Sequence, residues 1–191
     1  MAIILGLLAG SLRAGVKRRR LLVPDMALLW LVPIAFAPQF IAFFSPSPNS
    51  LLTVQLVPYF LVTSQVLLLL FAAANVKMPG FWFMLVGTAA NLIVILLNGG
   101  WMPISPETVN ALAPNALLGS WQIGQRLGLS KDIVLMVEDT RLWFLSDRFL
   151  MPRWLPYQVA FSIGDTLLAG GAFWFMWNLG NRPSNSIQEI T

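Results

Sequence analysis

The chain has 191 residues, of which 57% are hydrophobic and only 10% are charged, and its mean hydropathy is +0.73. Because soluble domains average about 25% charged residues, this composition excludes an ordinary soluble domain and predicts a single integral membrane domain over residues 1–191. Cysteine and histidine are both absent, which excludes disulfides, thiolate or histidine metal and haem sites, and Ser-His or Cys-His catalytic pairs.

Five apolar segments predict an all-α fold, a polytopic transmembrane helical bundle of about five spans, because a span needs about 20 residues. The predicted spans are residues 1–15, 21–44, 51–74, 81–97 and 154–179. The first segment is short, so an interfacial position for residues 1–12 stays open as an alternative. Prolines inside the second and third spans predict kinked or broken helices.

Basic residues set the predicted orientation, because cytoplasmic loops carry an excess of Lys and Arg. The basic run after the first segment is Lys17, Arg18, Arg19 and Arg20. The opposite turn at 45–50 has no basic residue. We therefore expect a multi-pass protein of the bacterial inner (cytoplasmic) membrane with a polar cytoplasmic tail at 180–191. The basic run is expected to contact lipid headgroups, and aromatic residues are expected to anchor the spans rather than to bind nucleic acid.

The long segment 99–153 is expected to be extracytoplasmic and helical, because it is too apolar for a solvated loop. Ser105 followed by Pro106 predicts a short helix that ends at Pro114. Residues 130–151 mix apolar and charged side chains, a pattern typical of a helix that lies in the membrane interface. This segment forms either a docking surface or lid, or a simple cover over the spans.

Asp165 is the sharpest candidate functional residue, because it lies about 11 residues into the last predicted span, near the bilayer midplane. A carboxylate at that depth costs roughly 2.5–3.5 kcal/mol and usually marks a site. The predicted polar intramembrane network is Asp165, Ser162, Gln158, Asn91, Gln55 and Tyr59. Three interpretations stay open for it: a proton or cation relay, a polar anchor for a lipophilic ligand, and an interhelical hydrogen bond that fixes packing.

The sequence lacks the residues that membrane enzymes need. An intramembrane aspartyl protease requires two facing acids, whereas only Asp165 is expected to lie deep in the bundle. No phosphate-binding glycine loop is present, and a carboxylate-bound dimetal site needs more acids than this chain can place together. We therefore expect no enzyme, no catalytic residue, no metal site and no cofactor.

Three short motifs resemble those of a known family. They are Asn-Gly-Gly-Trp-Met-Pro-Ile-Ser at 98–105, Leu-Trp-Phe-Leu-Ser-Asp at 142–147 and Phe-Ser-Ile-Gly-Asp at 161–165. In this order and spacing they resemble a bacterial membrane protein family of unknown function, domain of unknown function 5317. Ser146 stands where the family pattern has glycine. The resemblance implies a polytopic membrane protein and supplies no activity.

The resemblance also implies a second candidate site at the outer face, since it places Asp147 and Asp165 inside the family's own motifs. This outer-face set is Asn98, Gly99, Gly100, Asp147 and Arg148. The alternative is that these residues supply only turn and helix-cap chemistry.

Two functions follow as expectations. The first is a non-enzymatic membrane subunit that packs against lipids, other membrane subunits or a second copy, as an accessory or structural part of an energy-transducing or electron-transfer complex. The second is a small proton- or cation-coupled transporter that uses Asp165.

Overall fold

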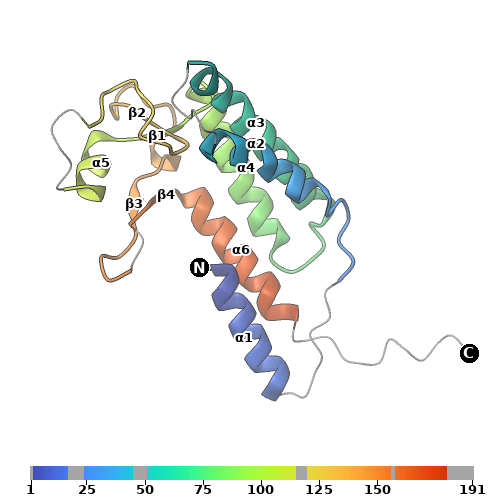
Figure 1. Cartoon of the computed structure of the whole chain (residues 1–191). Helices are drawn as coiled ribbons and strands as arrows, with labels where there is room; N and C mark the ends of the chain where they lie inside the picture. The colour runs from blue at the N-terminus through green and yellow to red at the C-terminus, as the bar shows by residue number, and fades with distance from the viewer. Residues whose placement is uncertain (1, 17–23, 45–50, 115–119, 156–157, 180–191) are drawn as a thin grey trace, which may run out of the picture.

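The computed structural model describes residues 2–16, 24–44, 51–114, 120–155 and 158–179. Most of these residues form long helices, and the segment between the fourth and the last long helix forms a separate group of short elements (Figure 1). The helices are α1 (Ala2–Val16), α2 (Leu31–Phe44), α3 (Leu51–Ala74), α4 (Phe81–Leu97), α5 (Pro106–Leu112) and α6 (Ile163–Leu179). The short elements are β1 (Met102–Ile104), β2 (Asp132–Val134), the 3-10 helix η1 (Trp143–Leu145), β3 (Phe149–Leu150) and β4 (Ala160–Phe161).

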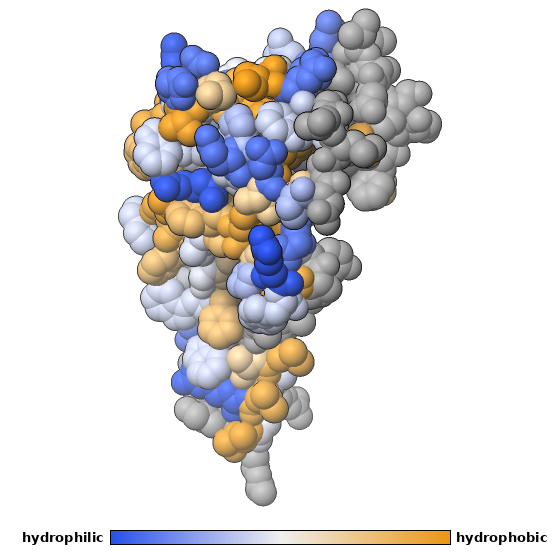
Figure 2. Space-filling view, turned by 90° about the vertical axis from the view of Figure 1, so that its left-hand side faces the viewer, coloured by the Kyte–Doolittle hydropathy of each residue, from blue (hydrophilic) through white to orange (hydrophobic). Residues whose placement is uncertain are grey.

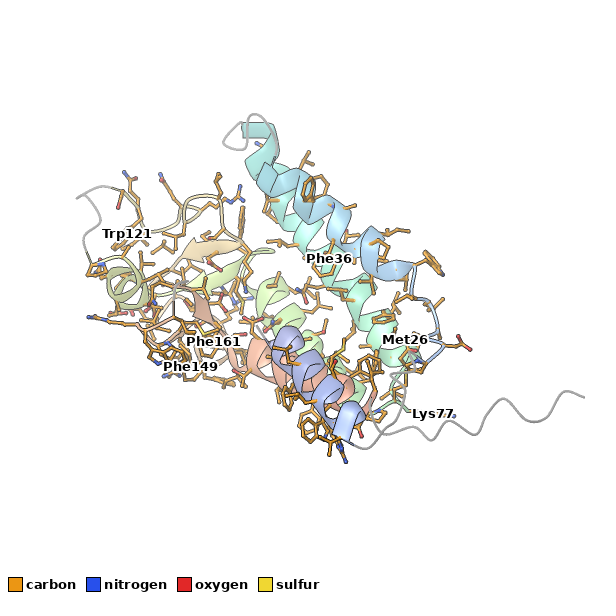
Figure 3. All side chains as sticks on the ribbon, turned by 60° about the horizontal axis from the view of Figure 1, so that its bottom comes forward. Met26, Phe36, Lys77, Trp121, Phe149 and Phe161 are labelled. Carbon is orange, nitrogen blue, oxygen red and sulfur yellow. The ribbon has the colours of Figure 1, made fainter. Side chains whose placement is uncertain are left out.

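The long helices pack in a row rather than around a common axis. Helix α1 packs on α6, α6 on α4, α4 on α3, and α3 on α2, so that α1 and α2 lie at opposite ends of the row (Figure 1). The described part of residues 98–161, which we call the lobe, caps one end of this row. Figure 3 shows Trp121 and Phe149 in the lobe and Met26 and Lys77 toward the other end of the molecule.

The prediction of a five-span, all-α bundle is wrong. Within the described residues only α3 is long and apolar enough to cross a membrane, through its residues Gln55–Ala74. Helices α4 and α6 have 17 residues each and α2 has 14, at or below the lower limit of the roughly 17–25 residues that a span requires. The lobe contains two small sheets, so the fold is not all-α.

The two central helices begin and end where the sequence predicts. Helix α3 covers residues 51–74 and α4 covers residues 81–97. Helix α4 ends at the predicted glycine turn. Gly99 and Gly100 both have positive φ angles, +73° and +86°, which glycine adopts without strain.

The last helix starts later than predicted, at Ile163 rather than near residue 154. Ser162 is the reason, because its hydroxyl accepts a hydrogen bond from the Asp165 backbone N–H at 3.0 Å. The Asp165 carboxylate in turn accepts from the Ser162 backbone N–H at 3.1 Å. This reciprocal pair is a capping box, a sequence-local start signal for a helix. Asp165 therefore lies in the first turn of α6 and not in the middle of a span.

The lobe is built around β1. This strand pairs in parallel with β2, and Ile104 also bridges to Asp147 on its other side. Buried Ile104, Val109 and Val134 form the core of the lobe. Helix α5 begins as predicted, with the Ser105 hydroxyl accepting from the Thr108 N–H and proline at the first helical position.

The predicted interfacial helix at 130–151 is wrong. This stretch forms β2, a series of turns, η1 and β3, and Leu142 within it takes a positive φ of 53° that interrupts any helix. Two of its apolar side chains, Leu142 and Leu145, pack on the buried Val94, Ile95 and Met102, whereas Trp143 and Phe144 are exposed.

Helices α4 and α6 approach each other through glycines. A Cβ added at Gly87 would lie 2.6 Å from the Gly164 backbone oxygen, and one added at Gly164 would collide with the side-chain oxygen of Asn91. Gly80, which caps the start of α4, makes a second close contact with Gly171 of α6. Small residues let helix backbones approach closely, and here they bring Asn91 of α4 against the first turn of α6.

Candidate functional site

Asp165 is held by neighbours from two helices. The Asn91 side-chain amide donates to Asp165 Oδ1 at 2.8 Å, and the Ser162 hydroxyl donates to Asn91 Oδ1 at 2.9 Å. Asn91 and Ser162 are buried, at 2% and 0% exposed. The carboxylate is thereby fixed in one orientation at the junction of α4, α6 and the lobe.

Lys131 links Asp165 to the lobe. Its ammonium nitrogen lies 3.0 Å from Asp147 Oδ2 and 3.5 Å from Asp165 Oδ2. The Lys131 side chain is 32% exposed, whereas that of Asp147 is 1% exposed. A single cation thus bridges two carboxylates that are 18 residues apart in the chain.

Strand pairing places a fourth charged group, Asp132, near the other three. Asp132 follows Lys131 and pairs with Met102 of β1, while Asp147 bridges to Ile104 on the opposite side of the same strand. The Asp147 backbone N–H donates to the Pro103 carbonyl at 3.1 Å. Pairing of β3 with β4, with Phe149 opposite Phe161, then returns the chain to Ser162. We call Lys131, Asp132, Asp147 and Asp165 the acidic cluster.

The carboxyl groups of the cluster titrate differently because their surroundings differ. Burial raises the pKa of Asp147 well above its usual range, although the Lys131 ammonium opposes this rise. Burial also raises the pKa of Asp132, again against Lys131. For Asp165 the desolvation cost is outweighed by Lys131 and by hydrogen bonds from Ser162 and Asn91, so its pKa lies below the ordinary value. Asp165 is therefore the firmly ionised member, and Asp147 is the member that favours a proton.

Lys131 remains charged in this setting. Burial alone would lower the pKa of its ammonium, but the carboxylates of Asp147, Asp165 and Asp132 outweigh that effect and raise it. The cation is thus a permanent part of the cluster rather than a proton donor at neutral pH. Within the part of the chain that the structure describes, no group of three His, Cys, Asp or Glu side chains has the arrangement of a metal site.

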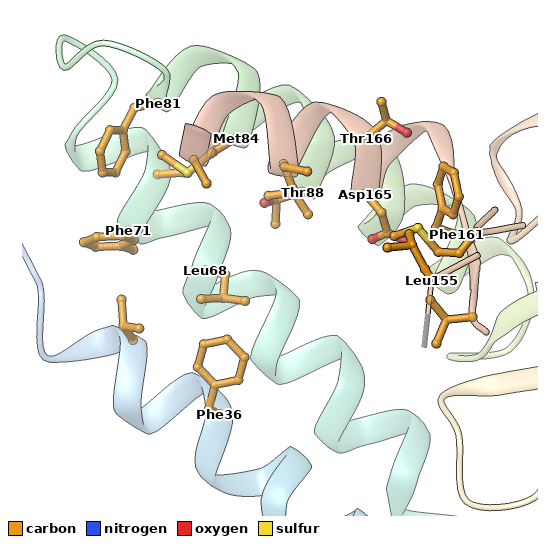
Figure 4. A pocket seen from close by; sticks show the side chains of 17 residues that line it. Phe36, Leu68, Phe71, Phe81, Met84, Thr88, Leu155, Phe161, Asp165 and Thr166 are labelled. Atoms are coloured by element: carbon orange, nitrogen blue, oxygen red, sulfur yellow. The ribbon is translucent and has the colours of Figure 1, made fainter. Parts of the chain in front are cut away.

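A large apolar cavity opens beside Asp165. Its volume is about 810 Å³, and it lies between α2 and α3 on one side and α4 and α6 on the other (Figure 4). Its lining includes Phe36, Leu68, Phe71, Phe81, Met84, Leu168, Ala169 and Ala172, with Leu155 and Phe161 from the lobe. The polar side chains in the lining are Thr88, Asp165 and Thr166. Figure 4 shows Asp165 near the lobe residues Leu155 and Phe161, and Phe71 and Phe81 at the far end.

Half of the predicted intramembrane network comes together. Asp165, Ser162 and Asn91 form one hydrogen-bonded group, as described above. Gln158 is exposed and donates instead to the carbonyls of Pro152 and Leu155. Gln55 and Tyr59 are exposed on α3, with Tyr59 70% exposed, and neither contacts Asp165.

The outer-face set separates into turn residues and cluster residues. Asn98 exchanges two hydrogen bonds with the Arg141 backbone, at 2.9 and 3.0 Å, and Gly100 packs against Pro58. Arg148 lies over the Trp143 ring at 4.3 Å and does not pair with Asp147. Only Asp147 of this set joins the acidic cluster.

The basic run Lys17, Arg18, Arg19 and Arg20 lies outside the described residues. Sequence reasoning missed Lys131 and Asp132 as site residues, because they reach Asp165 only through the pairing of two three-residue strands. The capping box of Ser162 and Asp165 was the one local signal that could have moved Asp165 to a helix start.

Comparison with known proteins gives one match. A family model described as a family of unknown function, DUF5317, matches residues 25–177. No curated protein and no solved structure matches the chain significantly.

Proposed function

The chain belongs to the DUF5317 family, and we propose that it is a non-enzymatic membrane protein that binds a lipophilic, amphiphilic molecule in its interhelical cavity. The observation that carries this proposal is the cavity of about 810 Å³ with apolar walls and the Asp165 carboxylate toward one end. Small-molecule sites are typically apolar cavities of about 300–1,000 Å³ in which a few polar groups orient the ligand.

The size of the cavity favours a small ligand over a protein helix. An α-helix with its side chains is about 10 Å across and rises 1.5 Å per residue. A cavity of about 810 Å³ would hold only about two turns of such a helix. A single alkyl or isoprenoid chain fits this space, with its head group beside Asp165 and its tail toward Phe71 and Phe81.

The surroundings of the cavity favour a membrane setting. Only 22% of the apolar stretch of α3 is buried inside the protein, whereas the core helix of a water-soluble fold is mostly buried, and this difference favours lipid around α3. Large apolar side chains are also exposed on other helices, among them Phe40, Ile93 and Leu96. Figure 2 shows hydrophobic and hydrophilic residues interspersed over the face that the lobe occupies. Contact with lipid would remove the exposed apolar side chains of the helices from water.

Filling the cavity tests the proposal. Ala169 lines the cavity on α6, and Ala169→Phe places a ring in it, whereas Ala73→Phe adds the same ring at an exposed position of α3. We expect native mass spectrometry of the protein, purified in mild detergent from its membrane, to show a bound lipophilic molecule on the wild type and on Ala73→Phe. Ala169→Phe should lose about tenfold or more of this occupancy. Equal occupancy in all three proteins would overturn the proposal.

A second candidate is a structural subunit that packs against partner membrane proteins. Three exposed tryptophans favour it, since Trp30, Trp82 and Trp154 are 60%, 59% and 80% exposed and tryptophan is enriched at binding hot spots. Co-migration with one larger complex at fixed stoichiometry on a native gel would support a subunit. Migration as a monomer or dimer that retains its ligand would favour the binding protein alone.

A transporter that uses Asp165 has weaker support. Its premise is an isolated acid deep in a span, whereas Asp165 lies in the first turn of α6 and is paired with Lys131. An uptake assay on an Asp165→Asn variant tests this alternative, and lost uptake with retained ligand would restore it.

A further inference from the structure

The charges beside the cavity do not balance. The Lys131 ammonium pairs with the carboxylates of Asp147 and Asp165, and the charge of Asp132 also acts on it. The Arg126 guanidinium contributes a second positive charge, through its interaction with Asp132. Among the described residues, three carboxylates and two cations therefore leave one excess negative charge. Because uncompensated buried charge is costly, the cluster requires one more positive charge, from a proton or from a bound cation.

Unsatisfied oxygens mark where this charge is missing. Asp147 and Asp132 are 1% and 8% exposed. Their Oδ1 atoms are buried and accept no hydrogen bond from any described residue. Two ionised carboxylates cannot hydrogen-bond to each other, since both are acceptors only. With one proton present, the Asp147 carboxyl can donate to Asp132, an interaction that favours the ionised form of Asp132.

The face that the cluster turns to the cavity is anionic. Asp165 lines the cavity, and Lys131 does not. A ligand head group in the cavity therefore meets a carboxylate first, with the ammonium of Lys131 behind it, 3.5 Å from Asp165 Oδ2. A carboxylate, phosphate or sulfate head would face like charge, which costs binding energy. An ammonium head would complete the charge balance and donate hydrogen bonds.

We propose, on the basis of the function above, that the cavity selects a single-chain amphiphile with a cationic amine head, and that this head replaces one proton held by the Asp132–Asp147 pair. On binding, the ammonium sits beside Asp165, Lys131 is held more closely by Asp147, and the proton of the carboxyl pair leaves to solvent. The total charge of the cluster with its occupant stays constant. The described charged groups that act on the pair are Arg126 and Lys131 before β2, Asp132 in β2, Asp147 after η1 and Asp165 in α6.

This exchange fixes the sign of the pH dependence. Bound protons compete with the amine, so amine affinity rises as pH rises, by up to about tenfold per pH unit while the pair still holds its proton. A neutral head of equal chain length displaces no proton, so its affinity is independent of pH.

The test compares three head groups on one chain length. Tetradecylamine, tetradecanol and tetradecyl sulfate are titrated into the full chain in an uncharged detergent, at about pH 6 and pH 8. The amine and the sulfate keep their charge over this range. We expect the amine to bind best and the sulfate worst, with only the amine binding more tightly at the higher pH. Asp147→Asn should remove the pH dependence, whereas the exposed control Asp139→Asn should keep it.

The outcomes separate the two proposals. If the three molecules bind equally, or the sulfate binds best, the head-group inference is wrong and the lipophile-binding function stands. The proposed function itself fails if none of the three molecules binds to the wild type and if Ala169→Phe and the wild type also show equal occupancy by a co-purified lipophilic molecule. The selectivity measurement uses the wild type, so it decides the question even if Asp147→Asn does not fold.

Discussion

At the scale of single residues, Lys131 connects the lobe to helix α6 through its ion pairs. It is the cation that faces both Asp147 and Asp165 within the described residues. Removing one partner of a buried ion pair leaves an uncompensated charge, which is usually much more costly than the pair is stabilising. The acidic cluster therefore affects stability chiefly because the loss of one member leaves a buried charge unpaired.

Replacing Lys131 by methionine is expected to destabilise the protein. The change keeps much of the side-chain volume and removes the charge, so that Asp147 and Asp165 lose their shared counter-ion. Fully buried pairs cost roughly 3–5 kcal/mol when broken. We expect about 2–3 kcal/mol here, because Lys131 is 32% exposed. Denaturant unfolding in detergent measures the change.

Lys131→Arg is the matched control, since it retains the positive charge. It should lose less than half as much stability as Lys131→Met. If both variants unfold at the wild-type denaturant concentration, the ion pairs do not hold the lobe on α6.

At the scale of elements, the apolar pattern predicted some parts of the fold and missed others for physical reasons. Helices α3 and α4 were located correctly because each is a long apolar run, and α4 ends at a glycine turn. The strands β1 and β2 have three residues each, and three residues carry too little periodicity to identify a strand.

The site residues on helices could be predicted from the sequence, whereas those brought in by strand pairing could not. Asp165 was found from its charge in an apolar run, and Asn91 and Ser162 from helical spacing. Its depth was wrong, because the apolar run continues before the true start of α6, where Ser162 and Asp165 cap the helix. Lys131 reaches Asp165 through strand pairing, which helical spacing does not encode.

The glycine contact between α4 and α6 gives a prediction at this scale. Gly164→Ala introduces a Cβ that collides with the Asn91 side chain. Over-packing of this kind costs roughly 1–3 kcal/mol, and here it also displaces the amide that orients Asp165. We expect a loss of about 2 kcal/mol, measured by thermal or denaturant unfolding.

Gly170→Ala is the control for this variant. Gly170 lies six residues further along the same helix, and a Cβ there meets nothing within 4 Å. It should leave stability unchanged or raise it by about 0.4–1 kcal/mol, since alanine restricts the unfolded chain. Equal effects of the two variants would contradict a close α4–α6 contact.

At the scale of the whole molecule, the row of helices explains why a cavity exists at all. A bundle closed around a common axis buries its apolar faces against one another. In this row, α2 and α3 lie on one side of the cavity and α4 and α6 on the other, which leaves room for the proposed ligand between them. The lobe covers one end of the row and supplies the charges that meet the head of that occupant.

The most direct test of this account is photo-cross-linking of tetradecylamine that carries a diazirine at mid-chain, followed by peptide mapping. We expect labelling of Phe36, Leu68, Ala169 and Ala172, which line the cavity, and loss of this labelling in Ala169→Phe. Labelling confined to exposed outer positions such as Ile93 and Leu96, and unchanged in that variant, would contradict it.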